Sequence, residues 1–173
     1  MPMKPIFVIT LMMAISYAAT AAQAQTADKA SQKFIKSAIE GNLAEIDVGK
    51  LAQQKGTTEA VKSFGEMLVK DHTDANEKAK QAALQLGVAP PTGSSIAEKA
   101  EYLKLKVLSG ATFDRTFAKD MVKDHKADIK DFQAEAQKSD AAGTFAKDTL
   151  PTLQKHLQTA QQLTQQTQTT GSR

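Results

Sequence analysis

The sequence predicts an all-α fold, an up-down four-helix bundle with one additional short helix. Apolar residues recur with the 3.6-residue period of an amphipathic helix in four long segments, and the alternation typical of strands is absent. Helix start and stop residues divide the chain into these segments, which are joined mostly by short turns. Four amphipathic helices of this length can bury their apolar faces together only as a bundle.

The N-terminus predicts a signal peptide at residues 1–24. Lys4 provides a basic start, residues 6–19 are apolar and uncharged, and Ala22 and Ala24 form a small-x-small cleavage site. A membrane anchor is the alternative, but the apolar stretch is short for a bilayer span. We therefore expect a mature chain that begins at Gln25, lacks a transmembrane helix and resides in the periplasm or cell envelope.

The composition excludes several classes of protein. The chain of 173 residues has no cysteine, which excludes disulfides, thiolate metal sites and a cysteine nucleophile. Its formal net charge is +3, and the charges are interleaved along the predicted helices, so nothing indicates a nucleic-acid partner. A protein partner in the envelope and the oligomeric state are left open.

The first two helices form a predicted hairpin. The first helix is expected from about Asp28 to Lys55, with Gly56 as its stop. Thr57 is expected to cap the second helix, which ends near Leu86. The following stretch, residues 88–93, contains two adjacent prolines and cannot be helical, so it is expected to link two helical pairs.

The additional short helix and the third long helix follow this linker. Ser95 and Glu98 have the spacing of a capping box and predict the start of the short helix, which is expected to end near residues 109–110. Thr112 is expected to cap a long helix that extends to about Lys138.

The last long helix is expected after a break at residues 139–143. Pro151 lies either near its first turn or at a kink inside it, and the sequence leaves both alternatives open. From Gln161 the chain is rich in Gln and Thr, which predicts fraying. The bundle domain is accordingly assigned to residues 25–160, and residues 161–173 are expected to form a flexible tail.

A weak internal repeat supports two helical hairpins. Residues 64–72 (FGEMLVKDH) and residues 117–125 (FAKDMVKDH) share their last four letters at an offset of 53 residues. Such a repeat predicts two hairpins related by a pseudo-twofold axis, which is a common way to build a four-helix core.

Each long helix carries one ionisable residue on its apolar face. His72, His125 and His156 lie on the faces of three helices, and Glu45 lies on the face of the first helix, one turn from Gly41 and from Gly49. The small glycines would let a neighbouring helix approach closely. Buried ionisable groups are costly unless they satisfy one another or bind an ion.

Two interpretations of this arrangement remain open. The four side chains converge on a mononuclear site for zinc, copper or iron, or they form a buried polar network without a metal. In the first case the two aspartates that precede histidines would be hydrogen-bond partners of the ligands or surface groups, because adjacent residues point about 100° apart on a helix. The proposed ligands are Glu45, His72, His125 and His156, and the two aspartates are Asp71 and Asp124.

The chain resembles an exported bacterial family known as domain of unknown function 4142, whose helices are similar to the ferritin-like bundle. The resemblance covers about residues 34–163 and implies a helical bundle in the periplasm or envelope, without a settled activity. The motifs that carry it are Glu45 with Leu51-Ala52, the stretch from Met67 to His72, Gly110 with Phe113-Asp114-Arg115, His125, Leu150-Pro151, and His156-Leu157.

An enzyme is not expected. A ferritin-like di-iron site needs Glu-x-x-His on two helices, but Val69 and Val122 occupy the glutamate positions, and no HExxH or GxSxG motif occurs. We expect a non-catalytic envelope protein with a structural or partner-binding role, in stress tolerance by resemblance only. The alternative is a periplasmic metal-binding protein. In either case, buried histidines predict that stability falls toward acidic pH.

Overall fold

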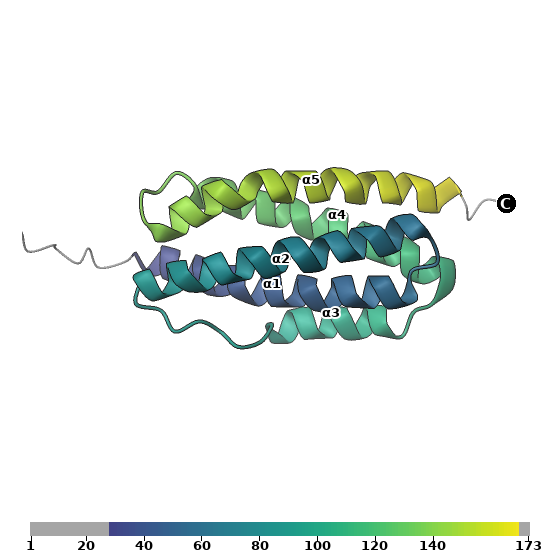
Figure 1. The fold of residues 1–173 in the computed structure, drawn as a ribbon, viewed down its shortest axis with the longest axis horizontal. Coiled ribbons are helices and arrows are strands. Elements are labelled where there is room, and N and C mark those ends of the chain that lie inside the picture. Colours follow the sequence, from purple (N-terminus) through teal and green to yellow (C-terminus); the bar gives the residue numbers. More distant parts are fainter. Residues whose placement is uncertain (1–27, 170–173) are drawn as a thin grey trace, which may run out of the picture.

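The computed structural model describes residues 28–169, which form five helices and no strand (Figure 1). This confirms the predicted all-α class. The predicted signal peptide lies outside the described residues. The helices are α1 (Lys29–Lys55), α2 (Glu59–Gln85), α3 (Ile96–Lys106), α4 (Gly110–Glu135) and α5 (Ala141–Thr169).

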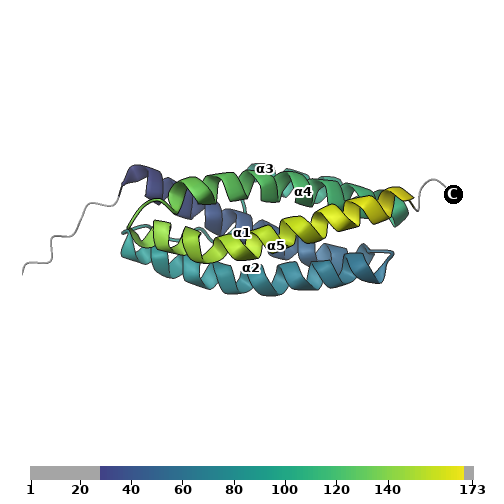
Figure 2. The ribbon, with the colours of Figure 1, turned by 90° about the horizontal axis from the view of Figure 1, so that it is seen from above.

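The four long helices form two hairpins, α1 with α2 and α4 with α5, which pack side by side (Figures 1 and 2). Asp114 near the start of α4 accepts a hydrogen bond from the backbone of Thr57 just before α2, so both helices start at the same end. Lys138 after α4 pairs with Asp28 before α1, at the opposite end. The directions are therefore up, down, down and up, and α3 with its linker is the single long crossover of a ferritin-like bundle.

Local capping explains where two of the helices begin. The Asp28 side chain accepts the backbone N–H of Ala30 at the start of α1. At α3 the predicted capping box is present, because Ser95 accepts the N–H of Glu98 and the Glu98 carboxylate accepts the N–H of Ser95.

Two predicted caps are wrong by one or a few residues. Thr58 and not Thr57 caps α2, because the Thr57 hydroxyl donates to Asp114 across the bundle instead. Thr112 lies inside α4, which begins at Gly110. Gly110, the first residue of α4, has a φ of 59°, a left-handed conformation that glycine adopts without strain, and Ser109 is at the N-cap position.

The last helix is longer than predicted. Pro151 lies within α5 and not in its first turn. The expected fraying from Gln161 is wrong for residues 161–169, which are helical. Leu163 is 3% exposed and packs with Ala160 in the core, so a few well-placed small and apolar side chains anchor a Gln- and Thr-rich segment.

The interior consists of two apolar clusters with a polar layer between them. One cluster includes Ile39, Phe132 and Leu153, and the other includes Phe64 and Phe117. The polar layer comprises Asn42, Glu45, His72, His125 and His156, all of which are buried. Burial of apolar side chains on both sides holds this layer at the middle of the bundle.

None of the described helices combines the length and the apolar content that a membrane crossing requires.

Candidate metal centre

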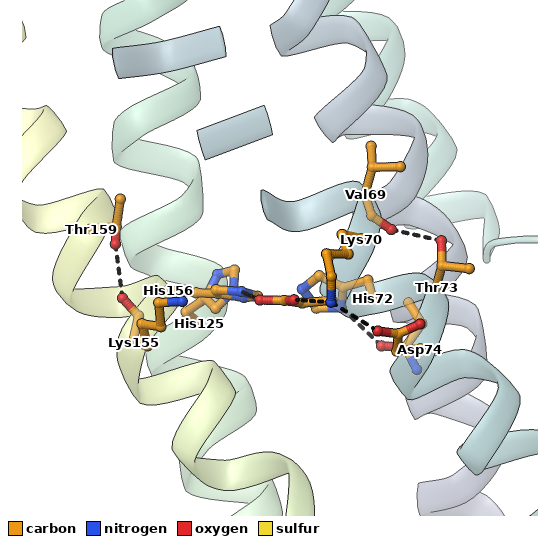
Figure 3. Close-up of polar contacts among 11 residues, drawn as sticks. Val69, Lys70, His72, Thr73, Asp74, His125, Lys155, His156 and Thr159 are labelled. Atoms are coloured by element: carbon orange, nitrogen blue, oxygen red, sulfur yellow. Dashed lines mark hydrogen bonds and ion pairs between the residues drawn. The ribbon is translucent and has the colours of Figure 1, made fainter. Parts of the chain in front are cut away.

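The three histidines meet inside the bundle. His72 comes from α2, His125 from α4 and His156 from α5, and their rings lie at one level of the bundle (Figure 3). One ring nitrogen of each lies within 4.8 Å of the corresponding nitrogen of the other two. His125 and His156 are fully buried and His72 is 4% exposed. The structure therefore gathers three of the four residues predicted as ligands.

Each imidazole is hydrogen-bonded at the nitrogen that faces away from the other two. All three partners are oxygen acceptors, so each ring donates its N–H outward. His72 Nδ1 donates to Asn42 Oδ1 at 2.9 Å, His125 Nδ1 donates to the carbonyl oxygen of Met121 at 3.0 Å, and His156 Nε2 donates to Asp71 Oδ2 at 3.0 Å.

These outward bonds decide what the inner nitrogens can do. A neutral imidazole has one N–H and one lone pair, so a ring that donates outward presents its lone pair inward. His125 Nε2 and His156 Nδ1 face each other at 3.2 Å, and neither has a proton to donate. Within residues 28–169, His72 Nε2 has no hydrogen-bond partner either. Three lone pairs thus point toward one small region, where a proton or a metal ion would satisfy them.

At neutral pH a proton is not expected to occupy the inner lone pairs, because the pKa values of the three histidines are lowered. Burial, together with the nearby His156, lowers the pKa of His125 to about 4. Burial also lowers the pKa of His72 well below its ordinary value. The pKa of His156 is lowered by burial as well, although its hydrogen bond to Asp71 opposes the shift. Neutral imidazoles are the form that coordinates metal ions.

Glu45 lies on the other side of the His125 ring. Its Oε1 is 3.9 Å from Nδ1 of His125, the nitrogen that donates outward to Met121. Burial raises the pKa of the Glu45 carboxyl well above its ordinary value, and nearby aspartates, Asp128 first among them, raise it further. The group of converging nitrogens is made of histidines alone, so the four-residue site that includes Glu45 stays a prediction.

The two aspartates beside the histidines have different positions. Asp71 reaches from α2 to α5 and accepts a hydrogen bond from the ring of His156, which holds that ring in place. Asp124 forms an ion pair with Lys123 and lines a pocket between α1, α3 and α4. Sequence analysis missed Asn42, although it lies one helical turn before Glu45 on the same face of α1.

The fold is that of a ferritin-like helical bundle with a single crossover. It is similar to a solved structure described as the crystal structure of a DUF305 fragment from Deinococcus radiodurans, with a TM-score of 0.71 and 13% sequence identity. The match covers 81% of this chain and 98% of that chain. At this identity the likeness concerns the fold alone.

The chain belongs to the family DUF4142, domain of unknown function, whose model matches residues 16–163. This confirms the resemblance seen in the sequence motifs. No curated protein matches the chain.

Proposed function

We propose that this protein binds one transition-metal ion, zinc or copper, through His72, His125 and His156, in the periplasm or cell envelope. The observation that carries the proposal is the set of three inward lone pairs, each fixed by an outward hydrogen bond. The predicted signal peptide supports the location. The two valines at the positions of di-iron glutamates support a binding protein over an oxidase.

The chemistry of the donors fits these metals. Imidazole nitrogens bind zinc at about 2.0–2.1 Å, so two ligands of a tetrahedral ion lie about 3.3 Å apart. His125 Nε2 and His156 Nδ1 are already 3.2 Å apart. Iron sites of proteins more often add a carboxylate to two histidines, and an all-nitrogen set is better suited to zinc or copper.

The outer partners supply the orientation that metal sites require. Ligating histidines usually donate their second N–H to a carboxylate, an amide or a backbone carbonyl, which holds the ring in place and strengthens its basicity. Here one partner of each kind is present, in Asp71, Asn42 and Met121. The network is therefore arranged around the inner nitrogens before any ion arrives.

The test is elemental analysis and metal titration of the untagged mature protein from periplasm. We expect one zinc or copper ion per chain, and no stoichiometric ion in the variants His72→Ala and His156→Ala. Phe64→Leu is the matched control, because Phe64 packs edge-on against His156 without donating to a metal. Absence of binding at saturating ion, or binding that survives loss of the histidines, contradicts the proposal.

A second candidate, the structural or partner-binding role, is favoured by the outer surface of α3. Ile96 is 88% exposed, Val107 is 81% exposed and Leu103 is 57% exposed, which is unusual for large apolar side chains. A photo-crosslinker at position 107 in living cells tests this role. A reproducible adduct with one envelope protein supports it, and a cross-linker that captures nothing opposes it.

A further inference from the structure

The crossover helix α3 is apolar on two opposite faces. Its inner face packs on the bundle through Leu105, which is 2% exposed, and through Tyr102, which contacts the same core cluster. Its outer face carries a second set of apolar side chains, all of them exposed. We call this set the outer stripe of α3; its members are Ile96, Ala100, Leu103 and Val107.

The outer stripe forms one continuous line along the helix. Its residues follow one another at intervals of four, three and four, the spacing of a single helical face. Leu105 is nine residues after Ile96 and therefore points about 180° away from it. The stripe is thus not part of the core, and exposed apolar surface of this extent is typical of an interaction site.

The position of α3 makes the whole stripe accessible. Figure 1 shows α3 at the outer edge of the bundle, running nearly parallel to α1. A flat surface could therefore meet the outer stripe along its full length.

Lysines border the outer stripe on both sides. In helical phase, Lys99 and Lys106 lie on one side of it and Lys104 lies on the other, and all three side chains are exposed. A lysine can lay its apolar stem along such a stripe while its ammonium group reaches outward. The border is therefore suited to an anionic surface.

Two of these lysines are without a counter-ion. Lys104 pairs with Asp120 on α4 at 3.3 Å, and Glu101 of α3 pairs with Lys123 on α4 at 3.2 Å, so these four charges cancel. Within residues 28–169, no carboxylate pairs with the other two lysines of the border. Their positive charge remains available to a partner outside the chain.

A second copy of this chain does not match the border. Two outer stripes packed against each other would bring lysines against lysines in either orientation, and like charges that flank a helical seam oppose association. An anionic partner satisfies both the stripe and its border.

We propose that the outer stripe docks the protein on a phospholipid bilayer surface that carries anionic headgroups. Helices that combine an apolar face with lysines lie in the plane of such a surface, with the apolar side chains at the headgroup boundary. The inference is independent of the metal site. It rests on the second candidate role and names a lipid surface as the partner.

Flotation of the full mature chain with lipid vesicles tests the proposal. We expect binding to vesicles of equal parts phosphatidylglycerol and phosphatidylcholine, and none to phosphatidylcholine alone. Binding should fall with salt, because the screening length shortens from about 10 Å at 0.1 M to about 3 Å at 1 M. Lys99→Gln and Lys106→Gln should each weaken binding about fivefold. Lys62→Gln, at an exposed position of α2, is the control and should leave binding unchanged.

A second pair of variants tests the apolar contribution. Leu103→Ser combined with Val107→Ser should weaken binding about tenfold or more, because these side chains would no longer be removed from water. Leu84→Ser is the matched control, since Leu84 is 66% exposed but lies on α2, outside the stripe. Circular dichroism establishes that each variant is folded.

Three outcomes would overturn the proposal: no binding to anionic vesicles, full binding by the stripe variants, or an equal loss in Leu84→Ser. A protein adduct captured at position 107 without any vesicle binding would also overturn it, and would leave the partner-binding role in place. Metal analysis of the same preparations is unaffected by either result, so each hypothesis can fail separately.

Discussion

The polar groups on the two sides of the His125 ring are stabilised in different ways: the histidines on one side and the carboxyl groups of Glu45 and Asp128 on the other. On the histidine side, every ring has an outward hydrogen-bond acceptor, and the lone pairs of the inner nitrogens point toward one another. On the carboxylate side, no hydrogen bond from residues 28–169 supports Glu45 or Asp128. Burial, together with the neighbouring acids, raises the pKa of Asp128 to about 7 and that of Glu45 well above its ordinary value. The histidine rings are oriented by hydrogen bonds to their neighbours, whereas the surroundings of the two carboxyl groups favour their protonated, neutral form.

This difference predicts how each side responds to an ion or to pH. The histidine side chains are neutral near pH 7 and their rings are held by outward hydrogen bonds, so metal binding there is expected to release few protons. The carboxylate side instead changes its charge with pH, because Glu45 and Asp128 lose their protons as the pH rises.

The largest expected effect is stabilisation of the fold by zinc. A ligand at 100 times its dissociation constant adds about 2.7 kcal/mol to the free energy of unfolding, because it binds the native state alone. His156→Ala should abolish this gain. Urea titrations at pH 7.5 with and without zinc measure it, and an equal gain in the variant would show that zinc acts elsewhere.

A smaller effect is expected from the partner of His156. Asp71→Asn keeps the shape of the side chain but removes the carboxylate that holds the ring, and should weaken metal affinity by about 10–100-fold. Asp74→Asn is the control, because Asp74 lies on the same helix and pairs with the exposed Lys70. Competition with a chromophoric chelator gives both affinities. Equal losses in the two variants would remove the special role of Asp71.

The smallest expected effect is the pH dependence of the stability of the metal-free protein. The lowered pKa values of the histidines mean that the unfolded chain binds more protons below about pH 6.5, so stability falls as the pH drops. Glu45 and Asp128 have raised pKa values, so the native state binds more protons between about pH 4 and pH 7, and stability rises as the pH drops. The two contributions oppose each other.

Removing the carboxylate contribution should expose that of the histidines. In a variant with Glu45→Gln and Asp128→Asn, the loss of stability between pH 7.5 and pH 5 should exceed that of the wild-type chain by an amount on the order of 1 kcal/mol. Urea midpoints at the two pH values measure the difference. A loss as small as that of the wild type would show that these carboxylates are ionised in the native state throughout.

The helical periodicity of the sequence was sufficient to predict the fold and the meeting of the three histidines. The histidines lie on the apolar faces of their helices, and helices of a bundle turn those faces toward one axis, so their convergence followed from spacing. The repeated VKDH sequence put His72 and His125 at matching positions of two hairpins. Helical phase does not define the side of a neighbouring ring on which a side chain lies, so the position of Glu45 beside Nδ1 of His125 could not be predicted from spacing.

The remaining features depend on tertiary packing. Asp128 lies one turn after His125 on the inward face of α4, so its spacing could have revealed it, but the way α3 covers α1 and α4 is not encoded in any period. The extension of α5 was hidden by its Gln- and Thr-rich composition, because Leu163 and Thr167 are enough to anchor it against the far core cluster. The composition of a segment is therefore a weak predictor of its helical extent when one buried residue per turn is enough to hold the helix in place.

The division into two hairpins also has a kinetic consequence. Contacts within each hairpin are local in sequence, so each pair of helices can form early, whereas contacts between the hairpins close a long loop through the linker and α3. His72 belongs to the first hairpin, and His125 and His156 belong to the second. We therefore expect the complete set of three imidazoles to assemble only when the two halves dock, so that an ion held there would report on the last step of folding.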